Sequence, residues 1–121
     1  QIKYSCFTCP DKLRKGREMI RIIVLFNLKS ETNRLTYENW AKSVDSPTVK
    51  ALSSVEGFSI HRAKSHLGSD LPSPFEFIEI LDVSSIDSLL LDILTEAMQS
   101  VAAQFQEFAD NSKFIVTEAL T

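Results

Sequence analysis

An excess of positive charge is lacking in this sequence, and its absence argues against one class of partner. The 121 residues contain 13 Lys and Arg against 16 Asp and Glu, for a formal net charge of −3. Proteins that bind a phosphate backbone carry an excess of Lys and Arg on one face. We therefore expect no nucleic-acid partner.

Long apolar runs are also lacking. The longest is Ile22–Phe26 with Leu28 beyond it, far below the ~20 residues that a membrane-spanning helix needs. Residues 1–18 alternate polar and basic residues around a few apolar ones, unlike the apolar core of a signal peptide. The sequence predicts a cytoplasmic protein with no membrane partner.

Cysteine and histidine are too few for a closed metal site. Cys6 and Cys9 have the C-x-x-C spacing of half a zinc site or a redox pair. The two histidines, His61 and His66, lie in a different segment, so four ligands are not expected in one place. A redox pair would open a helix, whereas Pro10 and a charged stretch follow Cys9. We expect no metal and no cofactor.

The chain has the length of one domain, enough for a single core but not for two. Residues 1–18 are rich in basic residues and have no apolar period, whereas Met19 stands directly before a β-rich segment. We expect an N-terminal extension at 1–18 outside the core fold, and a single ferredoxin-like domain over 19–121. The core fold should not depend on the extension.

The first half of the core predicts a strand followed by helix. Residues 20–28 are dense in β-branched and apolar residues, which predicts a central strand buried on both faces. An amphipathic helix is expected from near Thr36. Its apolar stripe consists of Tyr37, Trp40, Ala41 and Val44. Ser46 and Pro47 resemble an N-cap and first turn, so a second short helix is expected, ended by Gly57.

The second half predicts a hairpin, a long helix and a last strand. Residues 58–66 alternate in polarity and 75–83 are β-rich, with a loop containing Gly and Pro between them. Ser84 opens an S-x-x-D capping arrangement before an apolar period that predicts a helix over 85–108. The alternative is that this helix is broken into two near Thr95. Residues 113–120 form the last strand.

The resulting order, βαββαβ, is typical of a ferredoxin-like α+β fold, an antiparallel sheet with helices on one face. Both faces of the hairpin carry apolar side chains, so neither is simply solvated. One face carries Phe58, Ile60, Phe75, Phe77, Leu81 and Val83, and the other carries Ile78 and Ile80. We expect the sheet of a second copy to cover the open face, giving a homodimer with the form of a dimeric α+β barrel.

Two pairs of side chains on the hairpin are candidates for a site. A loop centred on residues 70 and 71 would place Arg62 opposite Glu79, either as a structural ion pair or as an anchor for a polar ligand group. His61 and Asp82 share the other face, where a base supported by a carboxylate would make them candidate catalytic residues. A histidine in such a place is more often structural or exposed.

Tyr37 and Trp40 are candidate ligand-binding aromatics. They lie three residues apart on the first helix, where they would line a pocket between helix and sheet. Core packing is the alternative reading, because aromatics at helical spacing usually fill a core. With Arg62 and Glu79 they complete the set of expected ligand-binding residues.

Four segments carry a resemblance to a known family. They are MIRIIVLFNL at 19–28, YENWAK at 37–42, GFSIHR at 57–62 and FEFIEILDV at 75–83. The core resembles the HapK or RedY-like family, small dimeric α+β-barrel proteins encoded with the pathways for red tripyrrole pigments, the prodiginines. The last segment is similar to a family motif of Tyr, Glu, Glu and Asp, although Phe75, which has no hydroxyl, opens it here.

The resemblance implies an accessory protein of prodiginine antibiotic biosynthesis that binds or processes an aromatic pyrrole intermediate, on the bipyrrole branch. The scarcity of catalytic groups favours a binding role. The alternative is a cofactor-independent monooxygenase or cyclase of the same superfamily, with His61, Asp82 or Tyr37 moving protons. A third reading is an interaction module without a small-molecule site, and the sequence does not decide whether the protein is an enzyme.

Overall fold

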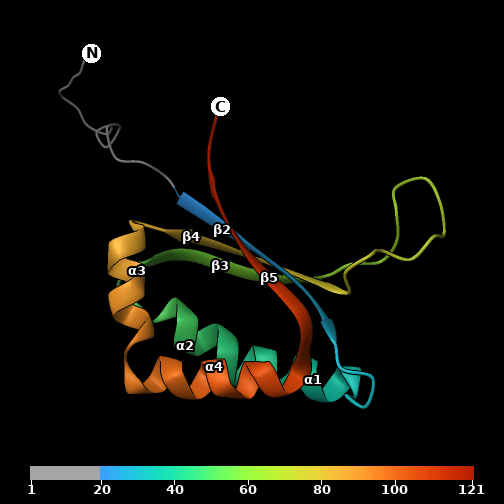
Figure 1. The fold of residues 1–121 in the computed structure, drawn as a ribbon, viewed down its shortest axis with the longest axis horizontal. Helices are drawn as coiled ribbons and strands as arrows, with labels where there is room; N and C mark the ends of the chain where they lie inside the picture. The colour runs from blue at the N-terminus through green and yellow to red at the C-terminus, as the bar shows by residue number, and fades with distance from the viewer. Residues whose placement is uncertain (1–19) are drawn as a thin grey trace.

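In a computed structural model, residues 20–121 are described, and they form a four-stranded antiparallel sheet with helices on one side (Figure 1). The elements are β2 (Ile20–Leu28), α1 (Arg34–Trp40), η1 (Ala41–Asp45), α2 (Ser46–Lys50), β3 (Val55–Arg62), β4 (Phe77–Val83), α3 (Ile86–Ile93), α4 (Glu96–Phe108) and β5 (Ala109–Glu118). The predicted βαββαβ order is present, with sheet order β3-β4-β2-β5. The extension expected at 1–18, with Cys6 and Cys9, lies outside the described residues.

The central strand β2 is buried on one face only. Ile22, Val24 and Phe26 point toward the helices and are buried, whereas the alternate residues Ile23 and Leu25 are half-buried on the open face. The prediction that this strand is buried on both faces is therefore wrong for the single chain. The helices cover one face of the sheet and leave the other face open (Figure 1).

The predicted hairpin is present, but its register differs from the prediction by two residues. Ile60 lies opposite Glu79 and Arg62 opposite Phe77, so the direct pairing of Arg62 with Glu79 is wrong. The chain turns around Gly68, whose φ of 82° is a conformation that glycine adopts without strain. A shift of two keeps every side chain on its predicted face.

The first helical region is continuous, contrary to the prediction of a restart at Ser46. Ser46 has helical angles, φ −58° and ψ −51°, and the residues before it form the single π-helical stretch η1. Pro47 has no amide hydrogen and cannot donate the usual i→i−4 hydrogen bond of an α-helix. The wider π-helical turn before it leaves room for the proline ring, so the helix continues without a break. The region ends at Lys50, and Gly57 belongs to β3.

The break near Thr95 is present. Thr95 caps α4, its side chain accepting a hydrogen bond from the Met98 amide, and Ser85 rather than Ser84 caps α3. β5 follows α4 directly, and the β2–β5 register shifts between Leu25 and Asn27. The last strand therefore begins earlier than predicted.

An aromatic cluster centred on Phe26 joins the sheet to α1 and α4. The Phe26 ring lies 5.6 Å from Tyr37, 5.5 Å from Phe77 and 4.9 Å from Phe105, measured between ring centroids. Phe26 and Tyr37 are both 0% exposed. This cluster holds the helical layer against the sheet and fixes the walls of the pockets described below.

Candidate functional site

A cavity of about 380 Å³, open to solvent at Leu90, Phe114 and Val116 and called the interior cavity below, lies between the sheet and the helices, mainly α3 and α4. Its walls are mostly apolar, formed by side chains that include Ile22, Leu81, Leu89, Val101 and Phe105. The cavity has the size and apolar character typical of small-molecule sites.

Two carboxyl groups, those of Glu79 and Asp45, line this apolar cavity. Strand alternation directs Glu79 from β4 toward the helices, where it is 7% exposed, and Asp45 ends η1 and is 4% exposed. Carboxyl groups are rarely buried without a partner. No ion pair to either carboxyl is found among residues 20–121.

Burial changes the ionisation of this cluster. The pKa of Glu79 is raised from its usual 4.5 to about 8, first by burial and then by the nearby charge of Asp45. Burial likewise raises the pKa of Asp45 from 3.8 to about 6. Burial, followed by the charge of Glu79, also raises the pKa of the Tyr37 hydroxyl. Glu79 is therefore mostly protonated at neutral pH.

The polar atoms of this cluster are under-satisfied. The Tyr37 hydroxyl and Glu79 Oε2 are buried and complete no hydrogen bond within the described part of the chain, although they are close enough to shift each other's pKa. Buried polar atoms in folded proteins nearly always have a partner. Of these two groups only the Glu79 carboxyl belongs to a residue that lines the interior cavity.

A second pocket, of about 460 Å³, is a cleft between the first helical region and the edge strand β3. Phe58 lines both this cleft and the interior cavity. Tyr37, Ile60 and Phe77 contribute further apolar surface to the cleft, while its polar groups come from the helices and from β3.

The four predicted ligand-binding residues do not meet in one pocket. Tyr37 and Arg62 line the cleft, and Glu79 lines the interior cavity. Trp40 lines neither of these two pockets, and its Nε1 donates to Gln104 Oε1 at 2.6 Å, so a ligand-binding role for it stays a prediction. Arg62 Nε lies 3.4 Å from Glu38 Oε2 instead of pairing with Glu79.

The candidate catalytic pair, His61 and Asp82, is not assembled within the chain. His61 lies opposite Ile78 and Asp82 opposite Gly57, a separation of ~13 Å along the strands. The carboxylate of Asp82 accepts hydrogen bonds from Arg21, the shorter from Nε at 2.7 Å. His61 therefore lacks the supporting carboxylate that the hypothesis required.

A model of the family described as REDY-like protein HapK matches residues 20–120. The chain belongs to the REDY-like HapK family. The predicted resemblance is thereby confirmed, and the match covers all nine helices and strands of the described chain.

Solved structures agree with this assignment at the level of the fold. HapK from Hahella chejuensis is 24% identical, with a TM-score of 0.70 over 84% of this chain and 92% of that chain. A dimeric ferredoxin-like protein of unknown function from Thermobifida fusca is 13% identical, with a TM-score of 0.68 over 86% and 93%. SnoaB, a cofactor-independent oxygenase from Streptomyces nogalater, is 9% identical, with a TM-score of 0.67 over 86% and 95%. No curated protein sequence matches.

The predicted ferredoxin-like α+β fold is confirmed by these HapK-family and wider similarities. Within residues 20–121, no three His, Cys, Asp or Glu side chains are grouped so that they could hold a metal ion. In the same residues, no helix has both the length and the apolar character needed to cross a membrane.

Sequence reasoning missed Asp45 in this HapK-family chain. Tyr37, Ala41 and Asp45 recur every four residues, a spacing that keeps side chains on one face of a helix. An acidic residue in line with two buried residues was the available signal. The π-helical stretch that ends at Asp45 has no comparable signature in the sequence.

Proposed function

We propose that this protein is an accessory protein of prodiginine biosynthesis that binds an aromatic pyrrole intermediate in the interior cavity. Membership of the HapK family, which the sequence resemblance associates with these pigments, supports the pathway. The observation that carries the proposal is the Glu79 carboxyl, buried in an apolar cavity with one oxygen unsatisfied.

Pyrrole chemistry complements this arrangement. A pyrrole is a flat, largely apolar ring with one N–H donor, and burying that donor without a partner is costly. The cavity offers an apolar surface for the ring and, in the carboxyl group of Glu79 that lines it, an acceptor for the N–H. A protonated Glu79 can in addition donate to a carbonyl oxygen on the ring.

Replacing Glu79 with methionine tests this assignment. The change keeps the side-chain length and removes the acceptor, so bipyrrole affinity should fall about tenfold, the value of one or two hydrogen bonds. Isothermal titration calorimetry with bipyrrole measures the change.

Glu107→Met is the matched control, because Glu107 is exposed on α4. It should bind bipyrrole like the wild type. Equal affinity in all three proteins, or no binding by the wild type at millimolar bipyrrole, would contradict the proposed site.

The second candidate function is a cofactor-independent oxygenase or cyclase. It is favoured by the same cluster, because a protonated Glu79 beside Tyr37 and Asp45 can hold and move a proton. SnoaB, which shares the fold, is described as a cofactor-independent oxygenase. Turnover of a pyrrole intermediate by the purified protein, lost in Glu79→Gln, would distinguish catalysis from binding alone.

We also propose that the protein is a homodimer joined through its open sheet face, as in a dimeric α+β barrel. Ile80, Ile23 and Ile115 are cross-strand partners in one row, and Ile78 and Leu25 are partners in the next. This apolar stripe is left uncovered by the helices (Figure 1). The Thermobifida fusca protein of similar fold is described as dimeric.

Light scattering at micromolar concentration should give twice the chain mass. Ile80→Asp should give one chain mass, because a carboxylate would be buried between the two sheets. Ala103→Asp, an apolar-to-acidic change on the exposed side of α4, should remain dimeric. A monomeric wild type would refute the dimer.

A further inference from the structure

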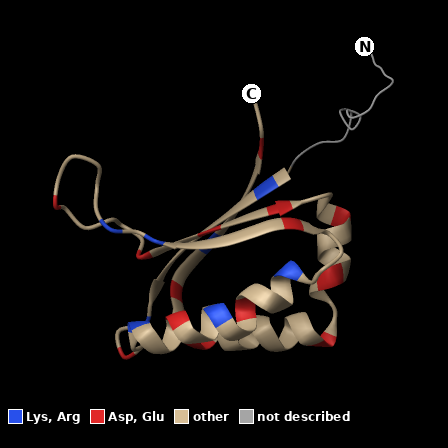
Figure 2. Ribbon diagram, turned by 180° about the vertical axis from the view of Figure 1, so that it is seen from behind, with Lys and Arg blue, Asp and Glu red and all other residues tan. Residues whose placement is uncertain are grey.

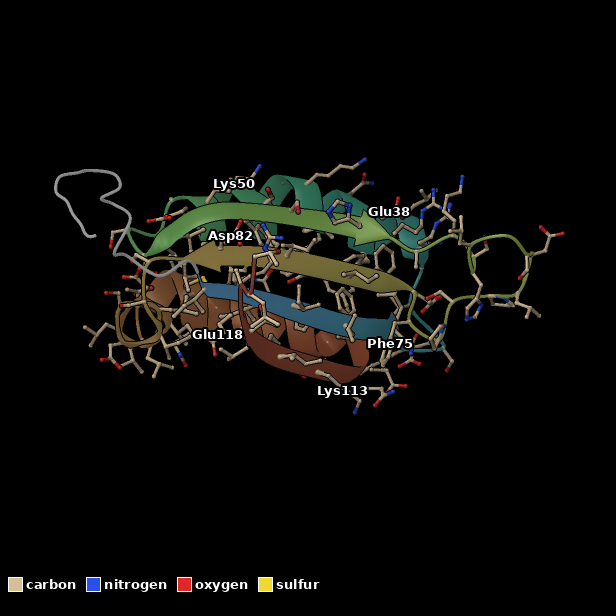
Figure 3. All side chains as sticks on the ribbon, turned by 90° about the horizontal axis from the view of Figure 1, so that it is seen from above. Glu38, Lys50, Phe75, Asp82, Lys113 and Glu118 are labelled. Carbon is tan, nitrogen blue, oxygen red and sulfur yellow. The ribbon has the colours of Figure 1, made fainter. Side chains whose placement is uncertain are left out.

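The cleft beside β3 gathers positive charge in a chain whose net charge is negative. Lys42, Lys50 and Arg62 line it, against a single carboxylate, Glu38, whereas the whole chain carries −3. Figure 2 shows Lys and Arg in blue on the helical layer, and Figure 3 labels Glu38 and Lys50 along the same edge as β3. The charge of this cleft is opposite to that of the chain as a whole.

One stripe of the helical region supplies these groups. Glu38, Lys42, Ser46 and Lys50 recur every four residues and all line the cleft, since residues four apart share a helix face. The neighbouring stripe of Tyr37, Ala41 and Asp45 turns inward. The cleft stripe thus carries two lysines and one carboxylate, whereas the inward stripe carries no cation and ends at the buried carboxyl of Asp45.

The positive charge of the cleft is only partly neutralised. Glu38 Oε2 lies 3.5 Å from Arg34 Nε and 3.4 Å from Arg62 Nε, so this one carboxylate is shared between two guanidinium groups. Lys42 and Lys50 form no ion pair with any residue from 20 to 121. An anion entering the cleft would therefore meet unpaired ammonium groups.

Apolar surface lies beside these cations. Phe58 and Phe77 are buried and line the cleft together with Ile60, and the cleft volume is about 460 Å³. A bare inorganic anion would leave this surface uncovered, whereas a flat ring would cover it and gain from burial. The lining thus suits a molecule that is apolar at one end and anionic at the other.

We propose that this cleft is a second ligand site, one that binds a small aromatic carboxylate. The ring lies on Phe58 and Ile60, and the carboxylate lies near Lys42 and Arg62, with Lys50 adding to the attractive field. The interior cavity disfavours the same molecule, because its mostly apolar walls would strip water from the carboxylate and offer it no cation in exchange. The two pockets therefore sort neutral from anionic aromatic ligands.

Naphthoate and its neutral analogue naphthamide are the probes, and calorimetry is the measurement. We expect the wild type to bind naphthoate about tenfold or more tightly than naphthamide. The double variant Lys42→Gln/Lys50→Gln should lose about tenfold in naphthoate affinity and little in naphthamide affinity. Inorganic phosphate should bind more weakly than naphthoate, because it lacks the ring.

A charge-matched control is Lys64→Gln/Lys113→Gln, which removes two cations that do not line the cleft. It should keep naphthoate affinity within about twofold of the wild type. The proposal is overturned by equal affinities for naphthoate and naphthamide, by phosphate binding as tightly as naphthoate, by equal losses in both double variants, or by no binding at millimolar naphthoate.

The outcome is independent of the pyrrole proposal. Glu79→Met should leave naphthoate affinity unchanged, since Glu79 lines the interior cavity and not the cleft. Loss of bipyrrole binding with intact naphthoate binding would support two separate sites. Loss of naphthoate binding in Glu79→Met would contradict the cleft as the site.

Discussion

Replacing Phe26 with alanine should lower the free energy of unfolding by about 4 kcal/mol, the loss typical of a deleted core phenylalanine. Phe26 is 0% exposed, and its ring contacts Tyr37, Phe77 and Phe105. Removal of the ring would leave a cavity where β2, β4, α1 and α4 meet, and these elements cannot all shift to fill it. Denaturant titration at one fixed protein concentration measures the loss.

Phe114→Ala is the control for this change. Phe114 is on β5 and is 60% exposed, so its removal should cost about 1 kcal/mol or less. Similar losses at the two positions would mean that Phe26 is not at the centre of the core.

Stability should fall as the pH rises from about 5 to about 8, the reverse of the usual effect of carboxyl groups. The pKa of Glu79 is raised from 4.5 to about 8 in the folded chain, so the folded state binds this proton more tightly than the unfolded state does. The contribution is fully present below the unfolded pKa and is lost as the pH approaches the folded pKa. The raised pKa of Asp45, about 6, acts in the same direction at lower pH.

Glu79→Gln should remove most of this pH dependence. A neutral amide has no charge to bury, so the variant should be more stable than the wild type at pH 8.5 by about 4 to 5 kcal/mol and nearly equal to it at pH 5. Denaturant titrations at both pH values give the comparison. The exposed Glu107→Gln should follow the wild-type curve, and a parallel curve for Glu79→Gln would show that Glu79 is ionised when folded.

The order of strands and helices could be read from local patterns, whereas the registers could not. Alternation assigned β3 and β4 to a hairpin and placed Arg62 and Glu79 on one face, as the structure has them. The register differed by two positions because the hairpin is centred between residues 69 and 70, one residue earlier than the expected centre at 70 and 71. A register shift of two residues leaves each side chain on the same face of the sheet, so the predicted fold was unaffected. The shift does change which residues are opposite one another, and the expected ion pair is therefore absent.

The candidate site was harder to predict because it depends on tertiary neighbours. Helical spacing puts Tyr37 and Trp40 on one side of α1, but Trp40 packs against α4, where its indole contacts Gln104 and Phe108. Nothing local to residues 37–42 indicates that cover. The proximity of Glu79 to Asp45 likewise depends on the packing of β4 against the end of the π-helical stretch η1. A π-helical end has no recognisable pattern in the sequence.

The position of Trp40 determines what intrinsic fluorescence can report. It is the one tryptophan of the sequence, and its indole N–H is held by Gln104 across the seam between α1 and α4. Its fluorescence emission therefore reports on the contact between α1 and α4, and the indole lines neither pocket. Shifts in the emission spectrum of this protein will report changes where α1 packs on α4, because no ligand in either pocket touches the indole directly.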